Sequence, residues 1–87
     1  MKIVVVGLGQ VGQELAKEMI SKNHEVTVID TNKNVVDYFT NKYEATGIVG
    51  SGASKEVQLN ARCNIADIVV ALTNIDEINL MVKFENG

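Results

Sequence analysis

The sequence of 87 residues predicts a single α/β domain, built on a parallel sheet that helices cover on both faces. Three observations predict this fold class. Short β-branched runs without polar alternation are typical of strands that are buried on both faces. Segments with apolar residues at helical spacing separate these runs. Glycine-rich or polar turns follow each run, so the chain is expected to alternate regularly between strand and helix.

The first strand and the first helix follow each other directly. Residues 3–6 read I-V-V-V and are expected to form the first strand. From Gln10 onward the apolar residues Val11, Leu15 and Met19 recur one turn apart, which predicts an amphipathic helix.

The next segments repeat this alternation. Residues 26–29 (V-T-V-I) predict a second strand, and Asn32 is a suitable cap for a second helix. Residues 45–49 predict a third strand that ends at a glycine-rich turn. A short helix is expected at about 54–61 and a fourth strand at 67–72.

The end of the chain is expected to be helical, because Asn74 and Glu77 have the spacing of a capping box. Right-handed crossovers then give the strand order 3-2-1-4, the first half of a doubly wound fold plus one strand. The fourth strand would form an edge of that sheet. Copies of the chain are expected to join through this strand, through the last helix, which carries Ile78, Met81, Val82 and Phe84, or through both.

Composition excludes several classes of protein. The net charge is −3, and no cluster of lysine or arginine could neutralise a row of phosphates, so nucleic acid is not an expected partner. No apolar run approaches the roughly 20 residues that span a bilayer. The single cysteine, Cys63, fits a structural thiol in a reducing compartment better than a nucleophile or metal ligand. We therefore expect a cytoplasmic domain.

The turn after the first strand fits the pattern G-x-G-x-x-G, which has a physical meaning between a strand and a helix. It consists of Gly7, Leu8, Gly9, Gln10, Val11 and Gly12. The first glycine permits a tight turn, the second lets a pyrophosphate approach the backbone, and the third lets the helix lie close to the sheet. This Rossmann-like arrangement predicts a dinucleotide site, with an ordinary strand-to-helix turn as the alternative.

Asp30 stands at the carboxyl end of the second strand, 18 residues beyond Gly12. An acid there accepts hydrogen bonds from the ribose hydroxyls of an adenosine and disfavours a 2′-phosphate, so NAD is favoured over NADP. Lys33 nearby weakens that preference. The alternative is that Asp30 is a solvated cap of the second helix.

These residues carry a resemblance to a known family. The opening M-K-I-V-V-V-G-L-G-Q-V-G, the V-I-D ending at Asp30, and the stretch A-D-x-x-x-A-x-T-x-x-D-E-x-N at 66–79 resemble the amino-terminal domain of the RCK/KTN family. Its members are cytosolic nucleotide-binding regulators of Trk- and Ktr-type potassium transporters and of some potassium channels. The likeness covers essentially all 87 residues. Because the family domain continues further, residues 1–87 are expected to be an incomplete form of it, either truncated or naturally shortened.

The resemblance implies a ligand, a site and partners. The ligand would be NAD(H) or else ATP or ADP, with phosphates on residues 7–12 and ribose on Asp30. The loop after the third strand would lie near the adenine, and the loop after the fourth would face the distal half of the ligand. These two loops contribute Ser51, Gly52 and Ala53, and Thr73 and Asn74. Gly50 is followed by Ser51 where family members commonly have an acid. The partner would be a membrane potassium transporter or channel, which the dimeric or ring-shaped protein meets at the inner face of the membrane.

No residue pattern predicts catalysis, because a hydride-transfer enzyme needs an acid or base from outside the cofactor fold. We therefore expect a regulatory domain and no enzyme. A cofactor-binding fragment of an NAD-dependent dehydrogenase is the alternative from the enzyme class. A methyltransferase-like binder of S-adenosylmethionine is a third reading, since such proteins also use glycines and a ribose-binding acid.

Overall fold

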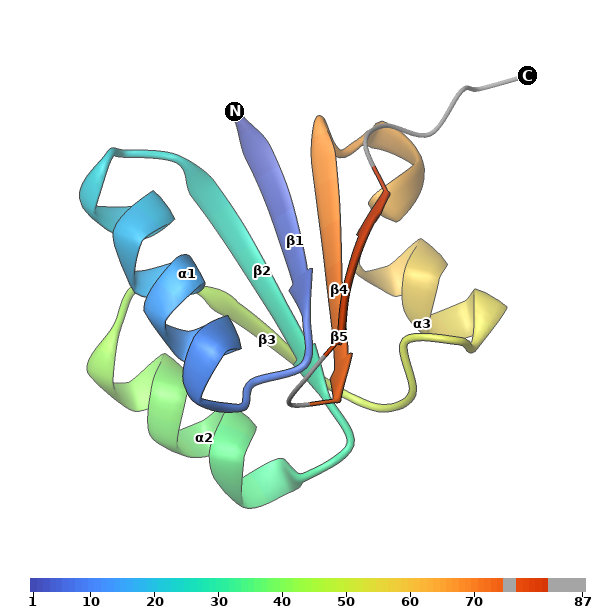
Figure 1. The fold of residues 1–87 in the computed structure, drawn as a ribbon, viewed down its shortest axis with the longest axis horizontal. Coiled ribbons are helices and arrows are strands. Elements are labelled where there is room, and N and C mark those ends of the chain that lie inside the picture. The colour runs from blue at the N-terminus through green and yellow to red at the C-terminus, as the bar shows by residue number, and fades with distance from the viewer. Residues whose placement is uncertain (75–76, 82–87) are drawn as a thin grey trace.

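The chain folds around one five-stranded sheet (Figure 1). The computed structural model describes residues 1–74 and 77–81, with the side chains of residues 1–72. The strands are Lys2–Val6 (β1), Glu25–Asp30 (β2), Thr46–Val49 (β3), Ile68–Asn74 (β4) and Glu77–Met81 (β5). Their order is β3-β2-β1-β4-β5, in which the first four strands are parallel. The predicted parallel order 3-2-1-4 is confirmed.

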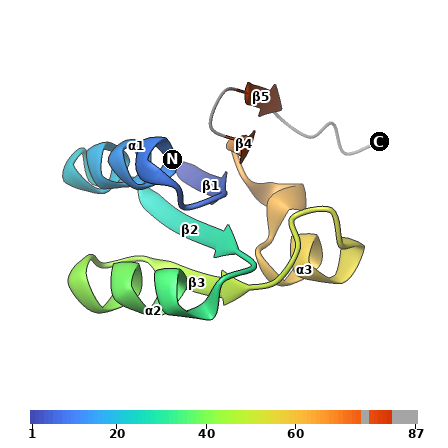
Figure 2. The ribbon, with the colours of Figure 1, turned by 60° about the horizontal axis from the view of Figure 1, so that its bottom comes forward.

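The helices lie on both faces of the sheet, as right-handed crossovers require. They are Gln10–Ser21 (α1), Lys33–Lys42 (α2) and Lys55–Asn60 (α3), followed by a 3₁₀ turn at Cys63–Ile65. α1 and α2 cover one face, whereas α3 covers the other (Figure 2). The side chain of Asn32 accepts hydrogen bonds from the amides of Asn34 and Val35, which confirms it as the cap of α2.

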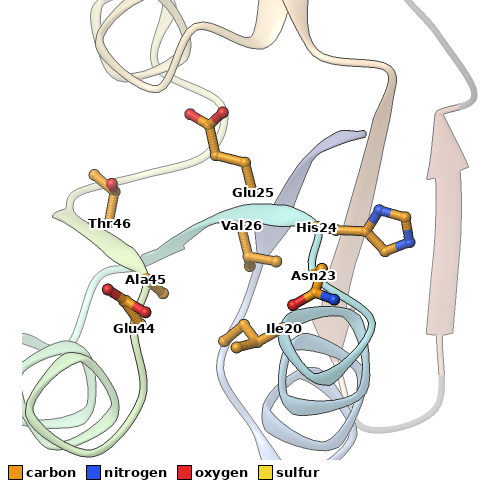
Figure 3. A pocket seen from close by; sticks show the side chains of 8 residues that line it. All are labelled: Ile20, Asn23, His24, Glu25, Val26, Glu44, Ala45 and Thr46. Atoms are coloured by element: carbon orange, nitrogen blue, oxygen red, sulfur yellow. The ribbon is translucent and has the colours of Figure 1, made fainter.

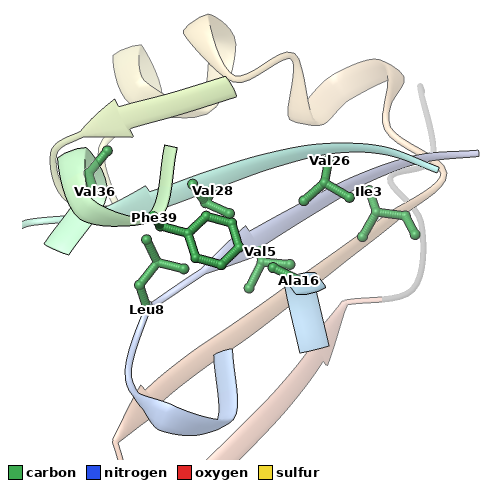
Figure 4. Close-up of a cluster of buried hydrophobic side chains, with 8 residues drawn as sticks. All are labelled: Ile3, Val5, Leu8, Ala16, Val26, Val28, Val36 and Phe39. Atoms are coloured by element: carbon green, nitrogen blue, oxygen red, sulfur yellow. The ribbon is translucent and has the colours of Figure 1, made fainter. Parts of the chain in front are cut away.

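Two hydrophobic clusters fill the layers on either side of the sheet. Neighbouring residues of β1 point to opposite faces, so Ile3 and Val5 join one cluster and Val4 joins the other. Under α1 and α2 the side chain of Phe39 points into the first cluster (Figure 4). Its members are Ile3, Val5, Leu8, Ala16, Val26, Val28, Val36 and Phe39. The core explains why the strand sequences lack polar alternation.

The predicted last helix is wrong over Glu77–Met81. These residues form β5, which pairs antiparallel with β4. A capping box is a local signal, and the unpaired backbone groups along β4 offer hydrogen bonds that a local signal does not include. The expectation that β4 is a sheet edge is wrong for the same reason. The remaining residues of the predicted helix, 75–76 and 82–84, lie outside the described part of the chain.

β5 carries a signal that the capping box obscured. The sequence E-I-N-L alternates polar and apolar residues over 77–80, the period of a half-buried strand. The pairing of β4 with β5 joins Val69 to Met81 and Val70 to Leu80. β4 itself runs two residues further than predicted, through Asn74.

Candidate functional site

The carboxyl ends of β1, β2 and β3 meet at one edge of the sheet, which we call the carboxyl edge. The amide of Gly7 donates to the carbonyl of Ile29 at 2.7 Å, and the amide of Gly50 donates to the carbonyl of Asp30 at 2.9 Å. These bonds hold the turn after β1 and the turn after β3 against β2. The structure therefore brings together the glycine turn, Asp30 and the start of the loop after β3.

The three glycines of the turn differ in what surrounds them. Gly7 has φ of +102°, and a Cβ there would meet the carbonyl oxygen of Leu72 on β4. A Cβ on Gly12 would meet the carbonyl oxygen of Gly7. α1 can therefore lie this close to the turn only because position 12 has no side chain. At Gly9, apart from the glycine itself and its two chain neighbours, no described residue has a heavy atom within 4 Å of where a Cβ would stand. Gly7 and Gly12 therefore serve packing, and Gly9 borders open space.

The amino end of α1 begins at that open position. Gly9 is the N-cap residue, and among the described residues no side chain caps the helix and no acid lies in its first turn. Gln10 and Val11 are exposed. The first amides of a helix lack partners inside it and form the positive end of the helix dipole. Gly9 thus leaves backbone donors accessible to an anion.

Asp30 is half-buried at the end of β2, and both carboxylate oxygens accept hydrogen bonds from backbone amides. Its Oδ2 accepts from Leu8 at 2.7 Å and its Oδ1 from Asn32 at 2.9 Å. The carboxylate thus ties the glycine turn to the start of α2, while Asn32 caps that helix. A carboxylate has roughly four acceptor positions, so acceptor capacity remains for hydroxyl groups of a ligand.

The loop at Ser51–Ala53 lies beside β1. A Cβ on Gly52 would meet Cγ1 of Val6, the last residue of that strand. The loop is ordered by its own bonds, from the amide of Ala53 to Ser51 Oγ at 3.1 Å and from Gln58 Nε2 to the carbonyl of Gly52 at 2.9 Å. Ser51 and Ala53 are exposed, so they are available at the carboxyl edge.

Thr73 and Asn74 occupy a different place from the one predicted. They are the last two residues of β4 and do not lie in a loop after it. The contact between Gly7 and the carbonyl of Leu72 brings this end of β4 against the glycine turn. Their backbone therefore lies beside the turn, at the carboxyl edge.

Gln13 also belongs to this region, although the sequence did not predict it as a site residue. Its side-chain amide donates from Nε2 to the carbonyl of Leu8 at 3.0 Å, while its backbone amide donates to the carbonyl of Gly9 at 2.9 Å. A glutamine one turn into a helix is an ordinary surface residue by sequence. Only the folded turn shows that its side chain reaches back to the glycine-rich segment.

A hollow of about 470 Å³ lies at the opposite edge, near the amino ends of β2 and β3, which we call the amino edge (Figure 3). None of the predicted site residues lines it. Two carboxylates, Glu25 and Glu44, stand in its wall, and the Glu25 carboxylate pairs with Lys2 Nζ at 3.7 Å. Its lining residues are Ile20, Asn23, His24, Glu25, Val26, Glu44, Ala45 and Thr46.

Cys63 lies away from the carboxyl edge, in the cluster under α3. It is buried, and this burial raises the pKa of its thiol above the ordinary value of 9.0. A buried thiol with a raised pKa is a poor nucleophile at neutral pH. The position fits the structural role expected from the sequence.

The fold and the order of glycine turn, uncapped helix and strand-end acid define a domain of the Rossmann-like class. The family model of the TrkA-N domain matches residues 3–83. The chain belongs to this family, which confirms the resemblance to the amino-terminal domain of the RCK/KTN regulators. Among the described helices, none combines the length and the apolar character needed to cross a bilayer.

Several curated relatives are similar to most of this chain. The Trk system potassium uptake protein TrkA of Vibrio alginolyticus is 35% identical over 80 residues, which cover 92% of this chain and 18% of the relative. TrkA of Halomonas elongata is 33% identical over 81 residues, covering 93% and 18%. A TrkA homolog 1 of Methanosarcina mazei is 35% identical over 95 residues, covering 100% and 20%. The chain therefore spans about a fifth of the length of these relatives.

Proposed function

We propose that the chain is a regulatory nucleotide-binding domain that controls a potassium transporter or channel. The observation that carries this proposal is the open space at Gly9, at the uncapped amino end of α1, next to the Asp30 carboxylate. An anionic group linked to a ribose fits this pair of features, because backbone amides bind the anion and the carboxylate accepts from hydroxyls. Similarity to potassium uptake proteins supports the regulatory part.

NAD(H) is the ligand that we propose first, with ATP or ADP as the second candidates. Membership in the TrkA-N family supports a nucleotide in general. The acid at position 30 favours a free 2′-hydroxyl over a 2′-phosphate, which would bring negative charge close to the carboxylate. This preference supports NAD(H) against NADP(H).

We assign the parts of the ligand to the carboxyl edge as follows. The pyrophosphate binds along residues 7–12, and the adenosine ribose binds Asp30. The adenine lies near Ser51, Gly52 and Ala53, whose loop packs on the end of β1. The distal half of the dinucleotide extends toward Thr73 and Asn74 at the end of β4.

We also propose a membrane potassium transporter or channel as the partner, and assembly of the chain into a dimer or ring. The relatives are named as parts of the Trk potassium uptake system, which supports such a partner. The domain would then lie in the cytoplasm, held at the inner face of the membrane through that partner. Nucleic acid does not belong to this proposal, since the chain is acidic overall with a net charge of −3.

The proposal includes no catalytic step, so the chain acts by binding. Family membership favours a regulator over the cofactor-binding fragment of a dehydrogenase. A regulatory ligand changes the populations of two conformations by binding one of them better. For this domain we expect nucleotide binding to alter the contacts between subunits.

Titration calorimetry with NADH, NAD, ATP, ADP and S-adenosylmethionine tests the proposed function. We expect saturable binding of NADH or an adenine nucleotide with one site per chain, and no binding of S-adenosylmethionine. Light scattering with and without the bound nucleotide then tests assembly. Binding of S-adenosylmethionine alone, or of none of these compounds, would contradict the proposal.

A further inference from the structure

Three interactions fix Leu8, two through its backbone and one through its side chain. Its amide donates to Asp30 Oδ2 at 2.7 Å, and its carbonyl accepts from Gln13 Nε2 at 3.0 Å. Its side chain is buried in the cluster under α1 and α2 and is only 2% exposed. The residue that precedes the open position Gly9 therefore has little freedom to rotate.

The groups that hold Leu8 are themselves fixed. Oδ1 of Asp30 accepts from the amide of Asn32 at 2.9 Å, so the carboxylate cannot turn away without breaking that bond. Gln13 belongs to α1, whose first turn is closed by the bond from its own amide to the carbonyl of Gly9 at 2.9 Å. The backbone of Leu8 is thus bound to β2 through Asp30 and to α1 through Gln13.

We propose that Asp30 and Gln13 are positioning residues that clamp the backbone of Leu8 between them. This clamp holds the glycine turn in its ligand-binding conformation. A turn that is already ordered loses less conformational entropy on binding than a mobile one. Asp30 then acts on phosphate binding through the turn, in addition to its contact with ribose. This inference rests on the proposed function, because it takes the turn as the phosphate site.

Charge repulsion alone predicts the opposite effect of neutralising Asp30 on phosphate binding. A carboxylate close to a bound pyrophosphate repels it, so neutralising the carboxylate would strengthen the binding of a ligand that has no ribose. The clamp predicts weaker binding of the same ligand, because the turn loses its order. A ribose contact alone predicts no change. Inorganic pyrophosphate therefore distinguishes the three accounts.

The experiment compares Gln13→Met and Asp30→Asn with the wild-type chain. Methionine keeps the length and helix propensity of glutamine but cannot donate to the Leu8 carbonyl. We expect amide hydrogen exchange at Leu8 to become about tenfold faster in the ligand-free variants, the scale of one lost hydrogen bond. The amide of Val28 in the core should keep its protection. NMR titration should show affinity for pyrophosphate about three- to tenfold weaker, and affinity for NADH weaker as well.

Gln58→Met is the matched control, because Gln58 makes the equivalent bond to the carbonyl of Gly52 in the other loop. It should leave exchange at Leu8 and affinity for pyrophosphate unchanged. Unchanged Leu8 exchange in Gln13→Met, or unchanged or tighter pyrophosphate binding in Asp30→Asn, would overturn the clamp. If the wild-type chain binds none of pyrophosphate, NADH, ATP and ADP, the proposed function fails instead, while Leu8 exchange still decides whether the two side chains hold the turn.

Discussion

The carboxyl edge and the amino edge of the sheet offer different chemistry to a ligand. The amino edge has a hollow of about 470 Å³, but Glu25 and Glu44 stand in its wall. The carboxyl edge presents an open glycine, an uncapped helix end and a carboxylate with acceptor capacity to spare. The comparison shows that a hollow is not by itself suited to a nucleotide, because the groups that line it decide which ligand it favours.

The difference arises from strand direction. Helices that follow parallel strands begin at the carboxyl edge, so their free amides gather there, whereas the helices end at the amino edge. An anion is therefore favoured at the former edge by the backbone itself. Side chains then refine the choice, with no acid in the first turn of α1 and two acids around the amino-edge hollow.

The largest effect is expected from Gly9→Val. A branched side chain would fill the open space through which a pyrophosphate reaches the backbone, so nucleotide binding should be abolished, by more than about 100-fold. No described atom lies near that Cβ, so the free energy of unfolding should change by no more than about 1 kcal/mol. Calorimetry with NADH and urea denaturation measure the two quantities. Near-native affinity in this variant would remove the glycine turn from the site.

Gly12→Ala should affect stability where Gly9→Ala does not. Its new methyl group would meet the carbonyl of Gly7, and separating α1 from the turn should cost about 2 kcal/mol of unfolding free energy. Gly9→Ala is the matched control, since the same methyl group there enters open space. Urea denaturation of both variants measures the difference. Equal stability would contradict the division of the glycines into packing and ligand-facing positions.

Asp30→Ala should weaken NADH binding by about 1 to 3 kcal/mol, the scale of hydrogen bonds to a charged acceptor. The fold should remain intact, because Asn32 and not Asp30 caps α2. Calorimetry gives the affinity, and circular dichroism checks the fold. If NADH affinity were unchanged while thermal stability fell, Asp30 would serve only the structure.

The smallest effects are expected at the amino edge. Glu25→Gln and Glu44→Gln remove charge from the hollow without changing side-chain size, and both residues are exposed. We expect NADH affinity to stay within about twofold and the unfolding free energy within about 0.5 kcal/mol. A marked gain or loss of NADH affinity in either variant would show that nucleotide reaches the hollow.

Local patterns predicted the parallel part of the fold well. The β-branched runs, the helical spacing after Gln10 and the cap at Asn32 each depend on neighbours in sequence, and the structure confirms them. The strand β5 could not be recognised from a capping box, because its stability comes from pairing with β4. At 77–81 the hydrogen bonds to β4 favour the strand that the alternating pattern indicates over the helix that the capping box indicates.

The candidate site was predictable in part. The glycine spacing and the acid after β2 indicated which residues meet at the carboxyl edge, since parallel strands end on the same side. The bonds of Leu8 to Asp30 and Gln13 were not predictable, because they join residues through the folded shape of the turn. The same holds for the amino-edge hollow, whose lining comes from three separate segments.

An NMR titration of the amide resonances with NADH tests the central claim most directly. If the carboxyl edge binds the nucleotide, the amides of residues 7–12, Asp30 and Ser51–Ala53 should shift and saturate together. The amides of the residues that line the amino-edge hollow, at 20, 23–26 and 44–46, should not move. Shifts confined to the amino edge, or none at either edge, would contradict the account.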